Sequence, residues 1–142
     1  MIVRSIGVAA GVTLALPILY WIFDRAPPFK LVSAEVLTER VAPGGFIQYR
    51  VTVFRYRSCP VLIETHVFDG QGRRFTLPDQ RNQGQAVLGA APSYVAVTAV
   101  PMLAAQGRGR FEVLLSYECN PLQRWWPIVI PGAAGEFEIV KP

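Results

Sequence analysis

The sequence predicts a mainly β protein: an antiparallel two-sheet β-sandwich of about seven or eight strands, preceded by one N-terminal transmembrane helix. The first observation is composition, since 51% of the 142 residues are hydrophobic and only 17% are charged. This excludes a disordered chain, a coiled coil and a highly charged nucleic-acid-binding tail. The second is one uncharged apolar run near the N-terminus, and the third is a series of short alternating segments between Gly and Pro turns.

The apolar run predicts a membrane-spanning helix. No residue from Ser5 to Phe23 is charged, and the span 6–23 approaches the roughly 20 residues that cross a bilayer as a helix. Tyr20 and Trp21 stand where aromatic side chains meet lipid head groups. We therefore expect residues 1–5 to be a short tail and residues 6–23 to be a signal-anchor.

A cleaved signal peptide and a buried soluble helix are the alternatives to this anchor. The stretch 23–28 has prolines directly after its only small residue, so it lacks the small-residue pattern of a cleavage site. A helix that is apolar on every face would need a larger core than the remaining chain can build. Both features favour a retained anchor.

Small residues recur along one side of the predicted anchor. Gly7, Gly11 and Ala15 are four residues apart, which places them in one stripe of a helix. Such a stripe allows a second helix to approach closely, either from a partner protein or from another copy of the chain as a homo-oligomer. A plain anchor without a helix partner remains the alternative.

A Pro-rich tether over residues 24–30 should lead to the β-sandwich domain over residues 31–142. The clearest strand is Phe46–Tyr56, where apolar and polar residues alternate. Val61–Phe68 alternates in the same way and ends in Asp69-Gly70, a hairpin signal. The other predicted strands are Leu31–Thr38, Arg73–Leu77, Tyr94–Val100, Arg110–Cys119, Ile128–Ile130 and Glu136–Val140, with residues 78–91 as a long loop.

The two cysteines decide the predicted orientation. Cys59 and Cys119 each precede a proline-containing break, so we expect them at one end of the sandwich, within bonding range. An even count in a small membrane-tethered domain favours one disulfide in an oxidising compartment over two free thiols. Arg4 before the span nearly balances Arg25 and Lys30 after it, so charge alone does not orient the helix. The disulfide indicates an extracytoplasmic, periplasmic domain.

Residues 31–140 resemble the immunoglobulin-like superfold. The resemblance rests on Cys59 and Cys119, which are sixty residues apart, and on Tyr117, which lies two residues before the second cysteine like a tyrosine corner. No tryptophan follows Cys59 on the next predicted strand. The resemblance implies an Ig-like sandwich.

No motif indicates catalysis, so we expect neither an enzyme nor a bound cofactor or metal. The chain has one histidine and lacks the common nucleophile, phosphate-loop and zinc motifs. His66 and Glu64 could form half a metal site, but a solvated strand face explains them better. The pairs Glu112 with Glu118 and Glu136 with Glu138 fit the wet side of strands better than a glycosidase pair.

The net charge is positive, with 14 Lys and Arg residues against 10 Asp and Glu residues, and most of the basic residues are arginine. A basic surface beside a membrane could meet anionic lipid or an acidic partner, although scattered solubilising arginines explain the same count. The aromatic residues lie mostly in apolar alternation, so specific nucleic-acid binding is not expected.

The stretch Arg124, Trp125 and Trp126 is unusual because two adjacent indoles cannot both face one strand interior. We expect one to pack in the core and the other to reach the surface. There, tryptophan and arginine favour contact with a partner, and tryptophan also favours the membrane interface.

Together these features predict a single-pass membrane-anchored, non-catalytic interaction or assembly module. It would serve as an accessory subunit of a membrane or envelope complex, with membrane lipid and a protein as its partners. A bacteriophage or virion-associated membrane protein is one alternative. A periplasmic domain that binds a small ligand or acts as an enzyme is another, because sandwiches host both.

Overall fold

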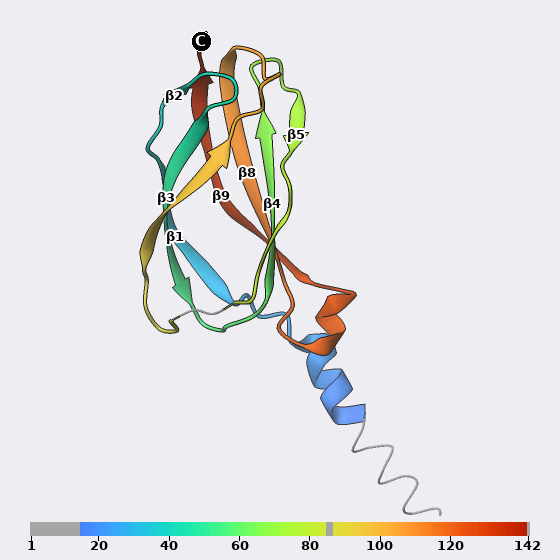
Figure 1. Ribbon diagram of the computed structural model, residues 1–142. Helices are drawn as coiled ribbons and strands as arrows, with labels where there is room; N and C mark the ends of the chain where they lie inside the picture. The colour runs from blue at the N-terminus through green and yellow to red at the C-terminus, as the bar shows by residue number, and fades with distance from the viewer. Residues whose placement is uncertain (1–14, 85–86, 142) are drawn as a thin grey trace, which may run out of the picture.

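The computed structural model describes residues 15–84 and 87–141, which form an elongated β-rich body with a helix protruding from one end (Figure 1). The helix covers residues 15–23. It is followed by β1 (Phe29–Val36), β2 (Arg40–Val41), β3 (Phe46–Arg55), β4 (Val61–Phe68), β5 (Arg74–Thr76), β6 (Gln80–Asn82), β7 (Ser93–Ala99), β8 (Gly107–Tyr117), the 3-10 helix η1 (Pro121–Arg124) and β9 (Ile128–Ile139). The prediction of a mainly β fold is confirmed.

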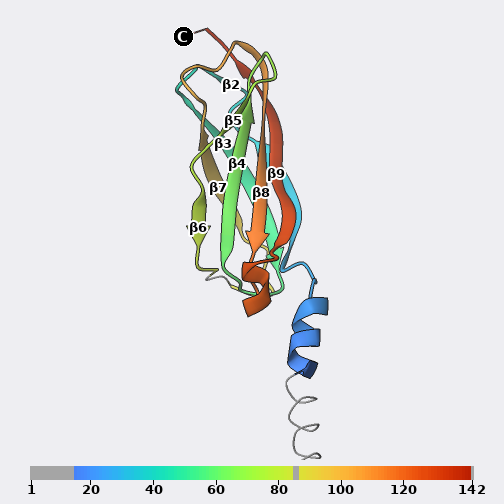
Figure 2. The ribbon, with the colours of Figure 1, turned by 90° about the vertical axis from the view of Figure 1, so that its right-hand side faces the viewer.

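The strands form two sheets. One has the order β1-β3-β7, and the other has the order β2-β9-β8-β4-β5, with β6 also paired to β4. All of these pairings are antiparallel except that of β2 with β9, which is parallel. The turned view in Figure 2 shows the helix and η1 at one end of the body and the last described residues at the other.

β3 lies at the centre of its sheet, between β1 and β7, and its period-2 alternation buries one face. Ile47, Tyr49, Val51 and Val53 are all buried, whereas Gln48 and Arg50 between them are exposed. The Tyr49 ring meets Phe111 of β8 at 4.5 Å between ring centroids, so the core joins the two sheets. Burying each large apolar side chain of this kind stabilises the fold by about 1.5–3 kcal/mol.

The predicted Asp-Gly turn between β4 and β5 is organised by the buried side chain of Asp69. Its Oδ1 accepts hydrogen bonds from the Gln71 and Arg73 amides, each at 2.9 Å. Its Oδ2 accepts from Arg73 Nε at 2.8 Å and from the Ala105 amide at 2.9 Å, which ties the β7–β8 loop to the turn. Burial by itself would raise the pKa of Asp69, but these hydrogen bonds outweigh it and lower the pKa to about 2.

β9 is one long strand, whereas the sequence predicted two short strands, Ile128–Ile130 and Glu136–Val140. The pairing with β8 shifts register between Glu112 and Leu114, and Pro131 lies beside this irregularity. Because β2 covers β9 only at residues 138–139, the missing N–H of Pro131 removes no hydrogen bond on that side. A proline and a bulge therefore interrupt the alternation without ending the strand.

Gly135 allows β9 to approach β1 of the opposite sheet. A Cβ atom at this position would lie 2.3 Å from Val36 Cγ2 and 3.0 Å from Phe111 Cε1. Any larger residue would push the two sheets apart here.

The sequence did not predict two of the short strands. The residues of β2 were expected to belong to a connection, and β6 lies inside the predicted loop 78–91.

The predicted membrane span, residues 6–23, overlaps the described residues only over 15–23, which are helical. Within residues 15–84 and 87–141, no helix is both long enough and apolar enough to cross a bilayer. Of the predicted stripe, Gly7 and Gly11 lie outside the described residues, while Ala15 is an exposed residue of the helix.

Candidate functional site: the helix–domain junction

Cys59 and Cys119 form a disulfide, as predicted, with Cα atoms 4.8 Å apart. Cys59 precedes β4 and Cys119 follows β8. These strands pair with Val61 opposite Tyr117, and the same register places the two cysteines opposite one another. The bond therefore joins neighbouring strand ends of one sheet, whereas the immunoglobulin disulfide crosses between sheets.

Tyr117 also differs from the tyrosine corner that the resemblance implies. A tyrosine corner lies near the start of its strand, but Tyr117 is the last residue of β8 and its ring packs 5.5 Å from that of Phe29. Burial raises the pKa of the Tyr117 hydroxyl to about 12, although the charge of Arg55 opposes this increase. Tyr117 is a core residue at the end of the domain from which the helix emerges.

The loop after Cys119 folds into η1 because Asn120 caps it. Asn120 Oδ1 accepts hydrogen bonds from the Leu122 and Gln123 amides at 3.1 and 3.2 Å, and Pro121 fills the first helical position, where no amide hydrogen is needed. Asn120 Nδ2 also donates to the Trp21 carbonyl at 3.2 Å. One side chain thus shapes the loop and contacts the end of the N-terminal helix.

Gln123 joins η1 to the segment after the helix. Its side chain is buried, with 2% of the residue exposed. Oε1 accepts from the Cys119 amide and Nε2 donates to the Asp24 carbonyl, each at 2.7 Å. Both ends of the amide are therefore satisfied, as a buried polar group requires.

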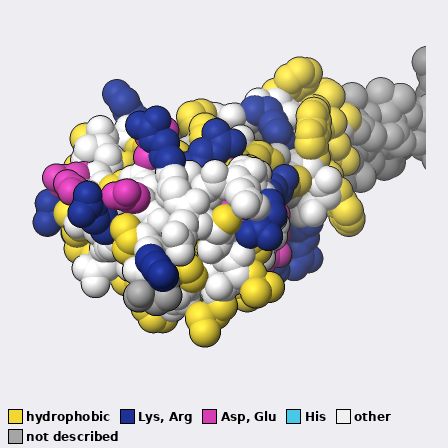
Figure 3. All heavy atoms as spheres, turned by 90° about the horizontal axis from the view of Figure 1, so that it is seen from above, with side chains coloured by type: hydrophobic (Ala, Val, Ile, Leu, Met, Phe, Trp, Pro, Cys, Tyr) yellow, Lys and Arg dark blue, Asp and Glu magenta, His cyan; other side chains and the backbone are white. Residues whose placement is uncertain are grey.

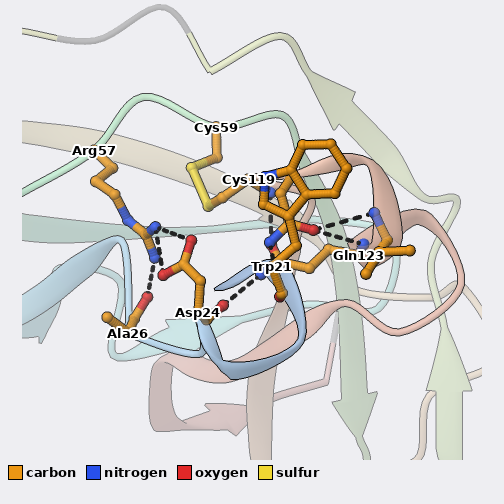
Figure 4. A network of polar contacts seen from close by, with 9 residues as sticks. Trp21, Asp24, Ala26, Arg57, Cys59, Cys119 and Gln123 are labelled. Atoms are coloured by element: carbon orange, nitrogen blue, oxygen red, sulfur yellow. Dashed lines mark hydrogen bonds and ion pairs between the residues drawn. A yellow bond between two sulfur atoms is a disulfide. The ribbon is translucent and has the colours of Figure 1, made fainter. Parts of the chain in front are cut away.

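Arg57, in the loop between β3 and β4, holds the same segment from the other side. Arg57 Nη1 lies 2.9 Å from Asp24 Oδ1 and 2.7 Å from Oδ2, and Nη2 donates to the Ala26 carbonyl. The Asp24 side chain is only 14% exposed. Figure 4 shows these contacts and those of Gln123 gathered around the disulfide.

Arg25 makes a third set of contacts. Its Nη1 donates to the Trp126 carbonyl at 2.7 Å and its Nη2 to the Pro127 carbonyl at 3.0 Å. The guanidinium also lies 4.5 Å from the centroid of the Trp126 ring, within cation–π range. The segment after the helix is thus bound to two loops, and the disulfide joins these loops to each other.

We call this cluster the junction: Trp21, Asp24, Arg25, Arg57, Asn120, Gln123 and Trp126. It changes the interpretation of residues 24–30, which the sequence predicted as an extended tether. Phe29 already begins β1, and the Pro28 carbonyl accepts from the Tyr56 and Arg57 amides at 2.8 and 3.1 Å. These contacts, together with those of the junction, attach the segment after the helix to the base of the sheets.

The sequence alone pointed to three of these residues: Trp21 and Trp126 by their aromatic rings, and Arg25 by its charge. The sequence did not indicate that Asp24, Arg57 and Gln123 form a network, since each belongs to a residue type that usually lies in solvent. Arg124, Trp125 and Trp126 do lie together at the end of η1. Trp125 is 82% exposed and Trp126 is 61% exposed, so neither packs in the core as expected for one of them.

His66 was expected on an outward, solvated face, but it is buried. Arg74 Nη2 lies 2.9 Å from His66 Nε2 and 3.4 Å from His66 Nδ1. Across the described part of the chain, no group of three or more His, Cys, Asp or Glu residues could hold a metal ion.

The glutamates that were considered as acidic pairs lie beside arginines. The ion pairs are Arg110 with Glu112 at 3.5 Å, Arg81 with Glu118 at 2.9 Å, Arg108 with Glu136 at 3.2 Å and Arg40 with Glu138 at 2.9 Å. Figure 3, which views the end opposite the helix, shows basic side chains scattered between apolar and acidic ones. Many of the arginines therefore neutralise neighbouring carboxylates.

A hollow of about 310 Å³ lies between the sheets beside β7. Its lining is mainly apolar, and Thr65, Gln80 and Tyr94 add polar groups at different points. This volume is at the lower end of the range of small-molecule pockets.

Comparison with known proteins yields no family: no family model and no curated protein matches the chain. Among solved structures, the Pseudomonas fluorescens alkylpurine DNA glycosylase AlkC, bound to DNA containing an abasic site analog, aligns with a TM-score of 0.48 and 14% identity. The alignment covers 80% of this chain but only 31% of the glycosylase. The structural genomics target SoR45 aligns with a TM-score of 0.32 and 14% identity, over 81% of this chain and 88% of that one. Neither likeness is close enough to bear on function.

Proposed function

We propose that the chain is a single-pass membrane-anchored, non-catalytic module with an extracytoplasmic, periplasmic Ig-like sandwich, acting as an accessory subunit of a membrane or envelope complex. The junction is the observation that carries this proposal. It fixes an apolar helix to the base of a β domain through polar contacts, most of them partly buried, which is the arrangement needed to hold a domain in a set orientation on a membrane.

The strand order supports the Ig-like part of the proposal. The central strands β4, β8 and β9 correspond in neighbour order to the CFG sheet of an immunoglobulin domain, and β1, β3 and β7 correspond to strands of the opposite sheet.

Exposed apolar side chains on the helix support the anchor. Leu16, Leu19 and Phe23 are all exposed, and Phe23 is 79% exposed. Water would be a costly environment for so many large apolar groups on one short helix, whereas lipid would accept them. The disulfide supports an oxidising, extracytoplasmic location for the domain.

The end opposite the helix offers a surface for a protein partner. Phe46, Met102 and Leu103 are exposed there, and Met102 lies over Gly44 in the turn before β3. We call these three residues the distal tip. Its distance from the anchor would direct it away from the membrane, toward a partner in the same complex. The Gly7, Gly11 and Ala15 stripe would add a helix contact, with a partner or with a second copy.

A test combines membrane extraction with crosslinking of the full chain in cells. The protein should stay in the membrane pellet after alkali treatment, and its two cysteines should resist alkylation until a reductant is added. Met102→Ala with Leu103→Ala should reduce crosslinking to its partner. Val32→Ala, at an exposed apolar position of β1, provides the control. Release by alkali or two free thiols in native protein would contradict the proposal.

The hollow beside β7 gives a second candidate function, binding of a small apolar ligand. It would be supported by a ligand that co-purifies with the protein and is lost when Ala96, a lining residue, is replaced by a bulky residue such as Leu.

The alternative of a virion-associated protein with the same fold and anchor would be recognised by the presence of this chain in purified virus particles.

A further inference from the structure

Two strongly exposed aromatic side chains of the β domain are adjacent in sequence and lie at its helix end. Trp125 caps the C-terminus of η1 and Trp126 follows it. Folding does not require this exposure, because Phe29 and Tyr117 fill the core at this end. An indole left in water at two consecutive positions indicates a surface that something else covers.

The position of Trp126 relative to the helix is set by the junction. Its carbonyl accepts from Arg25 Nη1, and its ring lies beneath the same guanidinium. Arg25 is two residues beyond Phe23, the last residue of the helix. Trp126 is therefore at the level where the apolar helix ends, and Figure 1 shows η1 beside this end of the helix.

The charges at this level are predominantly positive. In the stretches 20–26 and 118–127 the acidic residues are Asp24 and Glu118, and each is paired with an arginine, Arg57 or Arg81. Arg25 and Arg124 add two further positive charges, and Arg124 is exposed. Exposed tryptophan next to arginine matches the head-group layer of an anionic bilayer, where indoles lie at the interface and cations meet lipid phosphates.

We propose that the loop carrying Arg124, Trp125 and Trp126 lies in the head-group layer of an anionic bilayer, beside the point where the helix leaves the membrane. This inference rests on the membrane anchor of the proposed function. It assigns the loop to lipid in preference to a protein partner, because the lipid surface begins at the same level as the loop. The helix and the loop then make two contacts with one membrane, and the junction between them sets the tilt of the domain.

The three tryptophans of the chain allow the anchor and the loop to be tested separately. Trp21→Phe leaves Trp125 and Trp126 as the only tryptophans, so tryptophan emission then reports on the loop. Trp125→Phe with Trp126→Phe leaves only Trp21 and reports on the helix. Phenylalanine keeps an aromatic ring at each position, and near-ultraviolet circular dichroism checks that each variant remains folded.

Each full-length variant is reconstituted into vesicles of phosphatidylcholine and phosphatidylglycerol, with and without bromine on the upper acyl chain. We expect bromine to lower the emission of the Trp21→Phe variant, because indoles at the membrane interface lie close to the upper acyl chain. The Trp21-only variant should also be quenched. In vesicles without phosphatidylglycerol, or after Arg124→Gln, quenching of the loop should weaken.

The outcomes separate the two proposals. Quenching of Trp21 without quenching of Trp125 and Trp126 would overturn the loop's membrane contact and leave the anchor standing. A loop shielded from both bromolipid and aqueous acrylamide would also overturn it, since a protein would then cover the indoles. Failure of both variants to associate with vesicles would overturn the anchor itself. Equal loop quenching with and without anionic lipid would overturn the role assigned to Arg124.

Discussion

Gln123 is a single buried amide that satisfies two backbone groups from different parts of the chain. Replacing it with leucine keeps the volume but leaves the Cys119 N–H and the Asp24 carbonyl without their partner. We expect Gln123→Leu to lower the free energy of unfolding by about 2–4 kcal/mol, measured by denaturant titration of the full chain in detergent. Gln48→Leu, at an exposed position of β3, is the matched control and should change it by less than about 0.5 kcal/mol. Equal effects of the two substitutions would contradict the role given to Gln123.

Asp69 connects protonation to stability. Its pKa is lowered to about 2 in the folded protein, compared with about 3.9 in an unfolded chain. The carboxylate therefore stabilises the fold fully above about pH 4, and this contribution is lost as the pH falls toward about 2. Asp69→Asn should cost about 1.5–3 kcal/mol at neutral pH, since charge-assisted hydrogen bonds are removed.

The measurement for Asp69 is the free energy of unfolding as a function of pH. The difference between wild type and Asp69→Asn should be largest near neutral pH and should shrink as the pH approaches 2. Asp79→Asn, at an exposed site, serves as the control. A difference that stays constant between pH 2 and pH 6 would show that the charge of Asp69 is unimportant.

At the scale of the structural elements, the disulfide both stabilises the domain and connects two of its loops. It closes a loop with a sequence separation of 60 residues, for which the chain-entropy relation gives a stabilisation of about 4 kcal/mol. It also connects the Arg57 loop to η1, the two loops that bind the segment after the helix. Losing the bond should therefore weaken both the domain and its attachment to the helix.

The test compares Cys59→Ser with Cys119→Ser in one chain against the oxidised protein. Its free energy of unfolding should fall by up to about 4 kcal/mol, and amide hydrogens at Leu122 and Gln123 should exchange faster. Adding a reductant should destabilise the wild type and leave the double variant unchanged. Unaltered exchange in η1 would mean that the junction forms without the bond.

The molecule as a whole is elongated, with the helix at one end and the distal tip at the other (Figure 1). The contacts that determine this layout are the most distant in sequence. Gln123 reaches Asp24 across 99 residues, and Arg25 reaches Pro127 across 102. Under the proposed function, these contacts make the domain a rigid extension of the anchor and present the distal tip away from the membrane.

The sequence by itself determined the features that depend on near neighbours. The alternation in 46–56 and 61–68 predicted β3 and β4 closely, because a strand's two faces follow from period 2 alone. Asp69-Gly70 predicted the turn, and the even cysteine count predicted the disulfide. Tertiary structure alone decided the rest, because the deciding contact comes from a distant segment. Pro131 interrupts a local pattern but is tolerated where β9 has no neighbour on one side, and β2 forms because β9 accepts it. Asp24, Arg57 and Gln123 are individually ordinary polar residues, and only the packing of η1 against the end of the helix makes them one site.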